Sequence, residues 1–134
     1  MQRHNGITLI ELCIALVILA LLAGIAYPSY VQVVLRSHRA EASEALLALA
    51  ARQELYYTEF RRYSSSLMEL GLTELVTPSG RYQLSMEVAA DGMSYQLVAV
   101  ALGAQAADTE CQSFSLNHLG QRNIGLSYAD SCWL

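Results

Sequence analysis

The spacing of hydrophobic residues divides the chain into two parts. Residues 7–35 form an almost uninterrupted apolar run, in which Glu11 is the only acidic or basic side chain. Ile7–Tyr27 alone is 21 residues long. As an α-helix it would measure about 30 Å, which matches the hydrocarbon core of a bilayer. The first part of the chain is therefore predicted to enter a membrane as a helix.

Beyond Pro28 the apolar positions take a helical spacing. They recur at alternating steps of three and four, which is typical of a helix with one buried face: Leu35, His38, Ala42, Leu46, Leu49, Gln53, Tyr56 and Phe60. Charged residues, Arg39 among them, are expected largely on the other faces. Because Ala40–Tyr57 is rich in helix formers, one helix is predicted from about Ile7 to about Tyr57, with a bend near Gly24 and Pro28.

The second half of the chain has the pattern of a small β-sheet. Apolar residues alternate over 82–88 and 95–101, and Asp91-Gly92 between them predicts an antiparallel hairpin. A third strand is expected over Gln112–Leu116, with a turn around residues 117–120. A helix lying across such a sheet buries both apolar faces. The expected fold class is therefore α+β, a long N-terminal helix whose second half packs on a small antiparallel sheet.

Composition and charge narrow the classes of function. The 134 residues are 54% hydrophobic and 15% charged, which excludes a disordered chain. The chain has no lysine and a net charge of −4, so nucleic acid is an unlikely partner. Arg61 and Arg62, with aromatic residues on either side, form the only basic group suited to stacking on nucleic acid. Such a group more often marks a helix end with buried aromatic rings and solvated arginines.

The three cysteines fall into two groups. Cys13 lies in the apolar run, where an isolated cysteine usually behaves as a small hydrophobic residue. Cys111 and Cys132 follow the membrane segment and are interpreted as one disulfide formed outside the cytoplasm. A pair of reduced cysteines is the alternative. A metal site is less favoured, because the sequence has no Cys-x-x-Cys pair and no histidine at ligand spacing.

No motif indicates an enzyme or a cofactor. The sequence has no nucleophile elbow and no glycine-rich phosphate loop. His38 is expected on a helix face and His118 in a turn, each as a solvated or core histidine. We expect no catalytic residues, no cofactor and no metal.

A secretory signal or a plain anchor helix would each account for part of the N-terminus. Arg3 supplies a basic start for a signal, and the apolar run is long enough for an anchor. Neither kind of segment explains why Glu11 stands near the start of the apolar run, or why the polar leader ends abruptly at Gly6. The string Gly6-Ile7-Thr8-Leu9-Ile10-Glu11, followed by apolar residues, resembles the processing site of type IV prepilins.

This resemblance implies a role for each residue of the motif. Residues 1–6 would be a leader that prepilin peptidase removes between Gly6 and Ile7. Ile7 would then be N-methylated, and Glu11 would be the assembly glutamate. Residues 7–34 would form the transmembrane and assembly half of the helix, and residues 35–134 a periplasmic globular domain. The positive charges on either side of the apolar run do not by themselves set this orientation.

The role of Glu11 also has an argument from physical chemistry. An unpaired carboxylate among apolar residues costs several kcal/mol. Cleavage after Gly6 would create an amine at Ile7, which can meet Glu11 of its own chain or of a neighbouring helix. Pairing with a neighbour removes the cost only at one axial stagger, so Glu11 would set the register of assembly. A glutamate that merely reaches water at the membrane surface is the alternative.

The resemblance extends along most of the chain. Arg39-Ala40-Glu41-Ala42, Tyr56-Tyr57 and the end of the chain from Cys111 to Cys132-Trp133 look like minor pilins of the PilE type. Membership implies a structural subunit that helps to build the type IV pilus and supports twitching motility and surface attachment. Its partners would be other pilins, prepilin peptidase and the assembly machinery of the inner membrane, and its final location the pilus. A ComP-like DNA-uptake pilin and a major pilin are the alternatives.

Overall fold

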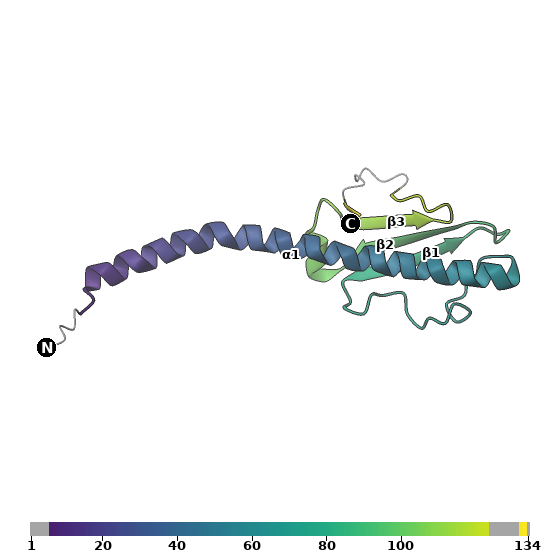
Figure 1. Cartoon of the computed structure of the whole chain (residues 1–134), viewed down its shortest axis with the longest axis horizontal. Coiled ribbons are helices and arrows are strands. Elements are labelled where there is room, and N and C mark those ends of the chain that lie inside the picture. The colour runs from purple at the N-terminus through teal and green to yellow at the C-terminus, as the bar shows by residue number, and fades with distance from the viewer. Residues whose placement is uncertain (1–5, 124–131, 134) are drawn as a thin grey trace. The chain divides into compact units, whose positions relative to one another are not determined.

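The computed structural model describes residues 6–123 and 132–133 (Figure 1). The expected leader, apart from Gly6, lies outside the described residues. The elements are α1 (Leu9–Phe60), β1 (Tyr82–Val88), β2 (Tyr95–Ala101), the 3-10 helix η1 (Gly103–Ala107) and β3 (Ser113–Asn117). Contacts divide the chain into two units, Met1–Val34 and Leu35–Leu134. Helix α1 contributes to both, and each unit is described by itself.

Helix α1 agrees with the predicted long helix to within a few residues at each end. It begins at Leu9 and ends at Phe60, and Pro28 lies inside it. The bend expected near Gly24 and Pro28 stays a prediction. In the first unit the large apolar side chains of the helix are exposed, whereas in the second unit one helix face is buried.

The buried face of α1 differs from the predicted stripe at four positions: Arg39 and Ser43 are buried, whereas His38 is half-buried and Phe60 is exposed. It comprises Leu35, Arg39, Ala42, Ser43, Leu46, Leu49, Gln53 and Tyr56. The expectation that Arg39 faces away from the sheet was wrong, because its guanidinium is paired with acidic residues of the second unit. Phe60 was expected in the stripe but is 51% exposed. It is the last residue of α1 and stacks on the Tyr56 ring, with the ring centroids 4.4 Å apart.

The sheet has the predicted antiparallel strands, in the order β1-β2-β3. Tyr82 pairs with Ala101 at one end of the first hairpin, and Gln96 pairs with Asn117 in the second. Strand β3 lies one residue later than expected. The turn between β1 and β2 contains Gly92 at a φ of +69°, a left-handed conformation that glycine adopts without strain.

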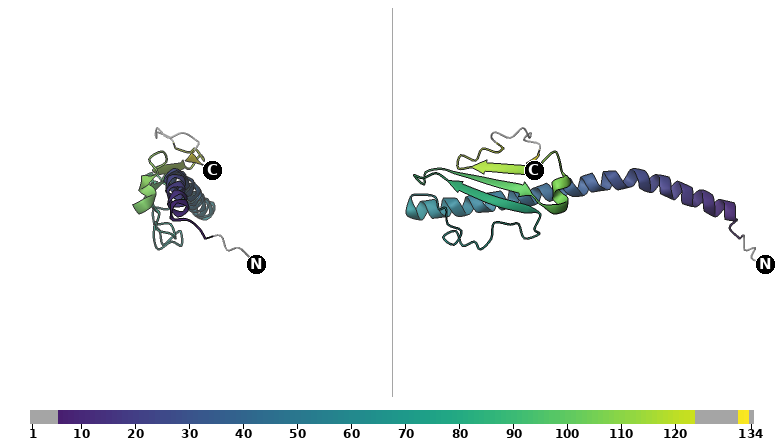
Figure 2. Two further views of the ribbon diagram at one scale, coloured as in Figure 1. Left: turned by 90° about the vertical axis from the view of Figure 1, so that its left-hand side faces the viewer. Right: turned by 180° about the vertical axis from the view of Figure 1, so that it is seen from behind.

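Helix α1 of the second unit covers one face of this sheet. It lies in front of the strands in Figure 1 and behind them in the right-hand view of Figure 2. Leu46, Leu97, Tyr82 and Phe114 are completely buried between the two layers. The Tyr82 and Phe114 rings meet edge to face with centroids 5.8 Å apart. The α+β fold class is therefore confirmed.

Helix η1 was not predicted. It follows β2 after Leu102, and Gly103 opens it with a φ of +55°. The Gln105 amide donates to the Leu35 carbonyl of α1 (3.0 Å), so η1 is held against the helix by a polar contact rather than by an apolar pattern. Its sequence, Gly-Ala-Gln-Ala-Ala, carries no periodicity that would distinguish it from a loop.

Candidate functional site

The motif residues Gly6, Ile7 and Glu11 lie together at the start of α1. Gly6 and Ile7 precede the helix and are exposed. Thr8 caps the helix: its Oγ1 accepts the Glu11 N–H (3.3 Å), and its carbonyl accepts the Leu12 N–H (3.1 Å). Glu11 stands in the first turn, where a negative charge is favourable to the helix dipole. Sequence reasoning missed the cap, although Thr-x-x-Glu before an apolar run is a recognisable capping pattern.

Glu11 is surrounded by exposed apolar side chains. Those of the first unit with more than half of their surface exposed include Leu9, Ile10, Leu12, Ile14, Leu16, Val17, Ile18, Leu19, Leu21 and Leu22. An 18-residue window of α1 has a mean hydropathy of 2.8, enough to cross a membrane by length and composition. In the described part of the chain no cation is paired with Glu11. A partner for this carboxylate, if it is buried in apolar surroundings, must come from outside the described residues of this chain.

A second group of charges joins α1 to the segment after η1. Arg39 Nε and Nη2 each donate to the Asp108 carboxylate at 2.7 Å, and Nη2 also donates to Glu110 at 3.1 Å. Arg39 is 6% exposed and Asp108 2% exposed. The hydrogen bonds from Arg39 to Asp108 raise the pKa of the guanidinium, against the opposing effect of burial. This buried pair fixes the position of the segment that leads to Cys111.

The structure joins Cys111 and Cys132 in a disulfide, with their Cα atoms 5.7 Å apart. Both cysteines are buried, and Trp133 packs beside them against Phe114 with ring centroids 6.0 Å apart. The Arg122 guanidinium lies 4.8 Å from the centre of the Trp133 ring. Residues 124–131 of this loop lie outside the described residues. Cys13 is a free, exposed cysteine of α1.

The helix end around Arg61 and Arg62 has its aromatic rings turned mainly into the protein. Tyr56 and Tyr63 are buried, Tyr57 is half-buried, and only Phe60 is largely exposed. The Tyr63 hydroxyl donates to Glu54 (3.1 Å). Arg61 and Arg62 are exposed. The arrangement is that of a helix end, with two solvated cations and few exposed rings for stacking.

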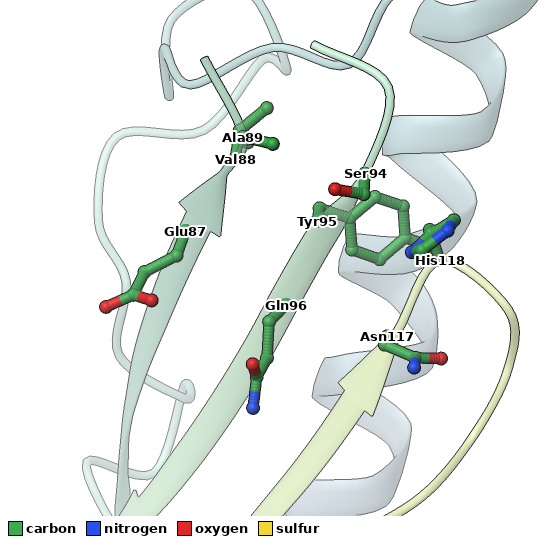
Figure 3. A pocket seen from close by; sticks show the side chains of 8 residues that line it. All are labelled: Glu87, Val88, Ala89, Ser94, Tyr95, Gln96, Asn117 and His118. Atoms are coloured by element: carbon green, nitrogen blue, oxygen red, sulfur yellow. The ribbon is translucent and has the colours of Figure 1, made fainter. Parts of the chain in front are cut away.

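A shallow hollow of about 350 Å³ lies at one end of the sheet (Figure 3). Glu87, Gln96 and Asn117 stand side by side across the three strands. Ser94 and His118 also line the hollow. Among the residues that the structure describes, no hydrogen bond joins Ser94, His118 and Glu87. The hollow therefore lacks the contact between nucleophile and base that covalent catalysis needs.

The remaining candidate residues are separated from one another. His38 Nδ1 donates to the side-chain oxygen Oε1 of Gln105 (3.0 Å), whereas the His118 ring lies near Tyr63 and Tyr95. Over residues 6–123 and 132–133, no group of three His, Cys, Asp or Glu side chains could hold a metal ion. The motif residues and the disulfide belong to different units.

Comparisons with known proteins match both units. The sequence profile of the family described as "Prokaryotic N-terminal methylation motif" matches residues 1–27. That of "Type IV minor pilin ComP, DNA uptake sequence receptor" matches residues 28–115. The type IV major pilin protein PilA of Myxococcus xanthus (strain DK1622) is 41% identical over 69 residues. That match covers 52% of this chain and 31% of the length of PilA.

A solved structure supports the same relationship. The high-resolution structure of a type IV pilin from Shewanella oneidensis superposes with a TM-score of 0.58 and 26% sequence identity. The match covers 75% of this chain and 98% of that chain. The profile that spans residues 28–115, the N-terminal methylation motif, the PilA relative and the shared fold agree with the resemblance of the Gly6–Glu11 motif. The chain belongs to the type IV pilin family.

Proposed function

We propose that the protein is a minor type IV pilin, a structural subunit that helps to build the pilus. The observation that carries this proposal is the single carboxylate of Glu11 at the start of the part of α1 in the first unit, which is otherwise apolar and largely exposed. Packing such helices side by side removes their apolar surface from water or lipid. The Ile7 amine of a neighbour would then neutralise Glu11 and set the register.

The second unit adds support, because α1 also carries exposed apolar side chains on the face turned away from the sheet, between exposed charged residues such as Glu44 and Arg52. Leu47 and Leu55 are 48% and 70% exposed, and Ala48 and Ala51 between them are exposed as well. A helix that covers a sheet in an isolated globular protein normally has a polar outer face. Exposed leucines on this outer face favour contact with further helices, as in a filament.

Processing and location follow from the same proposal. Prepilin peptidase would cut between Gly6 and Ile7, and Ile7 would then be N-methylated. The chain would wait in the inner membrane with residues 35–134 in the periplasm and then move into the pilus. Through the pilus it would support twitching motility and surface attachment.

The test measures processing and abundance together. Intact-mass analysis should show the loss of six residues and the gain of one methyl group. In sheared pili the protein should be present at a small fraction of the major subunit, and deletion of its gene should reduce piliation. A chain that begins near Tyr27 would instead establish a cleaved secretory signal. Near-stoichiometric abundance would make the protein a major pilin.

DNA uptake is a second candidate, favoured by the description of the profile that matches residues 28–115. Charge argues against it. Residues 35–134 contain 7 arginines and 11 acidic residues, a balance of −4. Non-specific affinity for DNA grows with the number of phosphates that cations neutralise. We expect the full chain in detergent to bind duplex DNA weakly and to lose it near physiological salt; tight, salt-resistant binding with normal piliation in the deletion strain would favour uptake.

A further inference from the structure

A groove runs beside the outer face of α1 in the second unit. Its volume is about 450 Å³, and small apolar residues, Ala45 and Ala48 of the helix and Pro78 of the opposite loop, line much of it. Glu41, Glu44 and Arg81 supply its charges. The groove therefore combines an apolar floor with an acidic margin.

One of the two carboxylates of the groove, Glu41, is already paired with a cation of this chain. Glu41 accepts hydrogen bonds from Arg81 Nη1 (3.1 Å) and from the Ser79 hydroxyl. These contacts, with Thr77, hold the pKa of Glu41 below its usual value although burial acts in the opposite direction. Arg81 is thereby neutralised within the groove.

The other carboxylate, Glu44, has no such partner. It is exposed and makes no ion pair or side-chain hydrogen bond with any residue of 6–123 or 132–133. The other cations along this part of α1 are engaged elsewhere. Arg39 binds Asp108, and Arg52 Nη1 donates to the Leu70 carbonyl (2.8 Å). The formal charge of the groove is therefore −1, carried by Glu44.

We propose that this groove is the docking site for a basic side chain, an arginine or lysine, of the adjacent pilin in the filament. The inference rests on the proposed function and adds a contact to it. The aliphatic stem of the incoming residue would lie on Ala45, Ala48 and Pro78, and its cationic end would reach Glu44. Long basic side chains bind in this way, with the stem on apolar surface and the charge at the margin. The exposed Leu47 next to the groove would be covered by the same neighbour.

The test compares two matched variants of the full-length chain in cells that assemble pili. Glu44→Gln removes the charge of the groove and keeps its shape. Glu87→Gln makes the same change on the outward face of β1, where the carboxylate is also exposed and has no ion pair among the described residues. For each variant, the amount recovered in sheared pili is divided by the amount in the membrane. Formation of the Cys111–Cys132 disulfide is the control for folding.

We expect Glu44→Gln to lower this ratio at least about threefold, as for the loss of one member of an interfacial charge pair. Glu87→Gln should leave the ratio unchanged. Unchanged incorporation of Glu44→Gln, or an equal loss with Glu87→Gln, would overturn the docking site. Improved incorporation of Glu44→Leu would also overturn it, by showing that the groove accepts an apolar side chain. Absence of the wild-type chain from pili would instead contradict the proposed function itself.

Discussion

At the scale of single residues, the second unit contains one ion pair that is buried on both sides, Arg39–Asp108, among the residues that the structure describes. The Arg39 guanidinium presents two parallel N–H groups to Asp108, a bidentate geometry that lysine cannot reproduce. Such a buried pair makes the folded state little more stable than two apolar residues of similar size would. Replacing only one of its residues, however, leaves an uncompensated charge in the interior. The consequences of a substitution therefore depend on which partner remains.

Replacing Arg39 alone should be strongly destabilising. Arg39→Leu leaves the Asp108 carboxylate buried without its cation, and we expect a loss of about 3 kcal/mol in the free energy of unfolding of the second unit. The double variant Arg39→Leu/Asp108→Leu should recover most of that loss, because no buried charge remains. Urea unfolding of the full chain in detergent, followed through Trp133 fluorescence, measures both. Equal stabilities of the single and double variants would contradict the argument.

Tyr82 should make stability sensitive to high pH. Burial, helped by the negative charge of Asp108 and opposed by the Gln105 amide, raises the pKa of Tyr82 from 10.0 to about 12. Between these values the unfolded chain loses the phenolic proton and the folded chain keeps it, so stability falls as pH rises through this window. Two pKa units correspond to roughly 3 kcal/mol. Tyr82→Phe should reduce this alkaline loss in unfolding midpoints measured across the window.

The same variant should change stability little at neutral pH. In the described part of the chain the buried Tyr82 hydroxyl has no hydrogen-bond partner of good geometry. Tyr30→Phe, at an exposed position of the first unit, is the matched control and should leave the alkaline loss as in the wild type. If the Tyr82→Phe protein still shows the full loss of stability at alkaline pH, other groups cause that loss. Tyr95 is one such group, because burial also raises its pKa.

At the scale of elements, the C-terminal end depends on a covalent tie and a few aromatic contacts. The disulfide connects Cys132 to the segment between η1 and β3, over a sequence separation of 21. Trp133 then packs on Phe114 of β3, while Arg122 covers its ring. No described strand extends beyond β3. The tie therefore holds Cys132 and Trp133 against the end of the sheet, in addition to the aromatic contact with β3.

Removal of the disulfide should loosen this end before the rest of the unit. The chain-entropy model assigns about 3 kcal/mol to a loop of this length. In the double variant Cys111→Ala/Cys132→Ala we expect a comparable loss of stability and greater access of a quencher to Trp133. Cys13→Ala is the control and should leave both unchanged. Trp133 quenching equal to that of the wild type would show that packing alone holds the end.

At the scale of the whole molecule, two units of the same chain are suited to different surroundings. The first exposes apolar side chains along α1 and carries one carboxylate, whereas the second buries a mixed apolar and polar core. Glu11 lies in the first turn of α1 and belongs to the first unit, whereas the buried core belongs to the second. Replacement of Glu11 can therefore separate assembly from folding.

Glu11→Ala should leave the amount of membrane-inserted protein unchanged or raised, because it removes a charge that is costly in an apolar environment. Incorporation into pili should fall about tenfold or more, since the amine of a neighbour loses its partner and the register is no longer specified. Fractionation of membranes and sheared pili measures both quantities. Glu59→Ala, an exposed position near the end of α1, is the control. Wild-type incorporation of Glu11→Ala would refute the pairing.

Local patterns in the sequence determined the elements and the N-terminal motif. Apolar spacing predicted α1, β1 and β2 closely, because a helix or strand with one buried face repeats its hydrophobic residues at the period of its backbone. The Gly6–Glu11 motif is likewise local, since all of its residues lie within two turns. The cysteine pair could be proposed from position and number alone, and the structure joins it.

Only the tertiary structure decided which polar residues are buried. Arg39 lies on the buried face because Asp108, 69 residues away, supplies its counter-charge, and no periodicity encodes that partner. Gln53 is completely buried because its side-chain amide makes two hydrogen bonds with the Ser64 backbone. Its Nε2 donates to the Ser64 carbonyl (2.7 Å), and its Oε1 accepts the Ser64 N–H (3.0 Å). Helix η1 is held by Gln105 through two such contacts to α1, with the Leu35 carbonyl and the His38 ring. Burial of a polar group depends on a partner brought close by the fold, whereas most buried apolar groups of the second unit could be predicted from their spacing along the helix or strand.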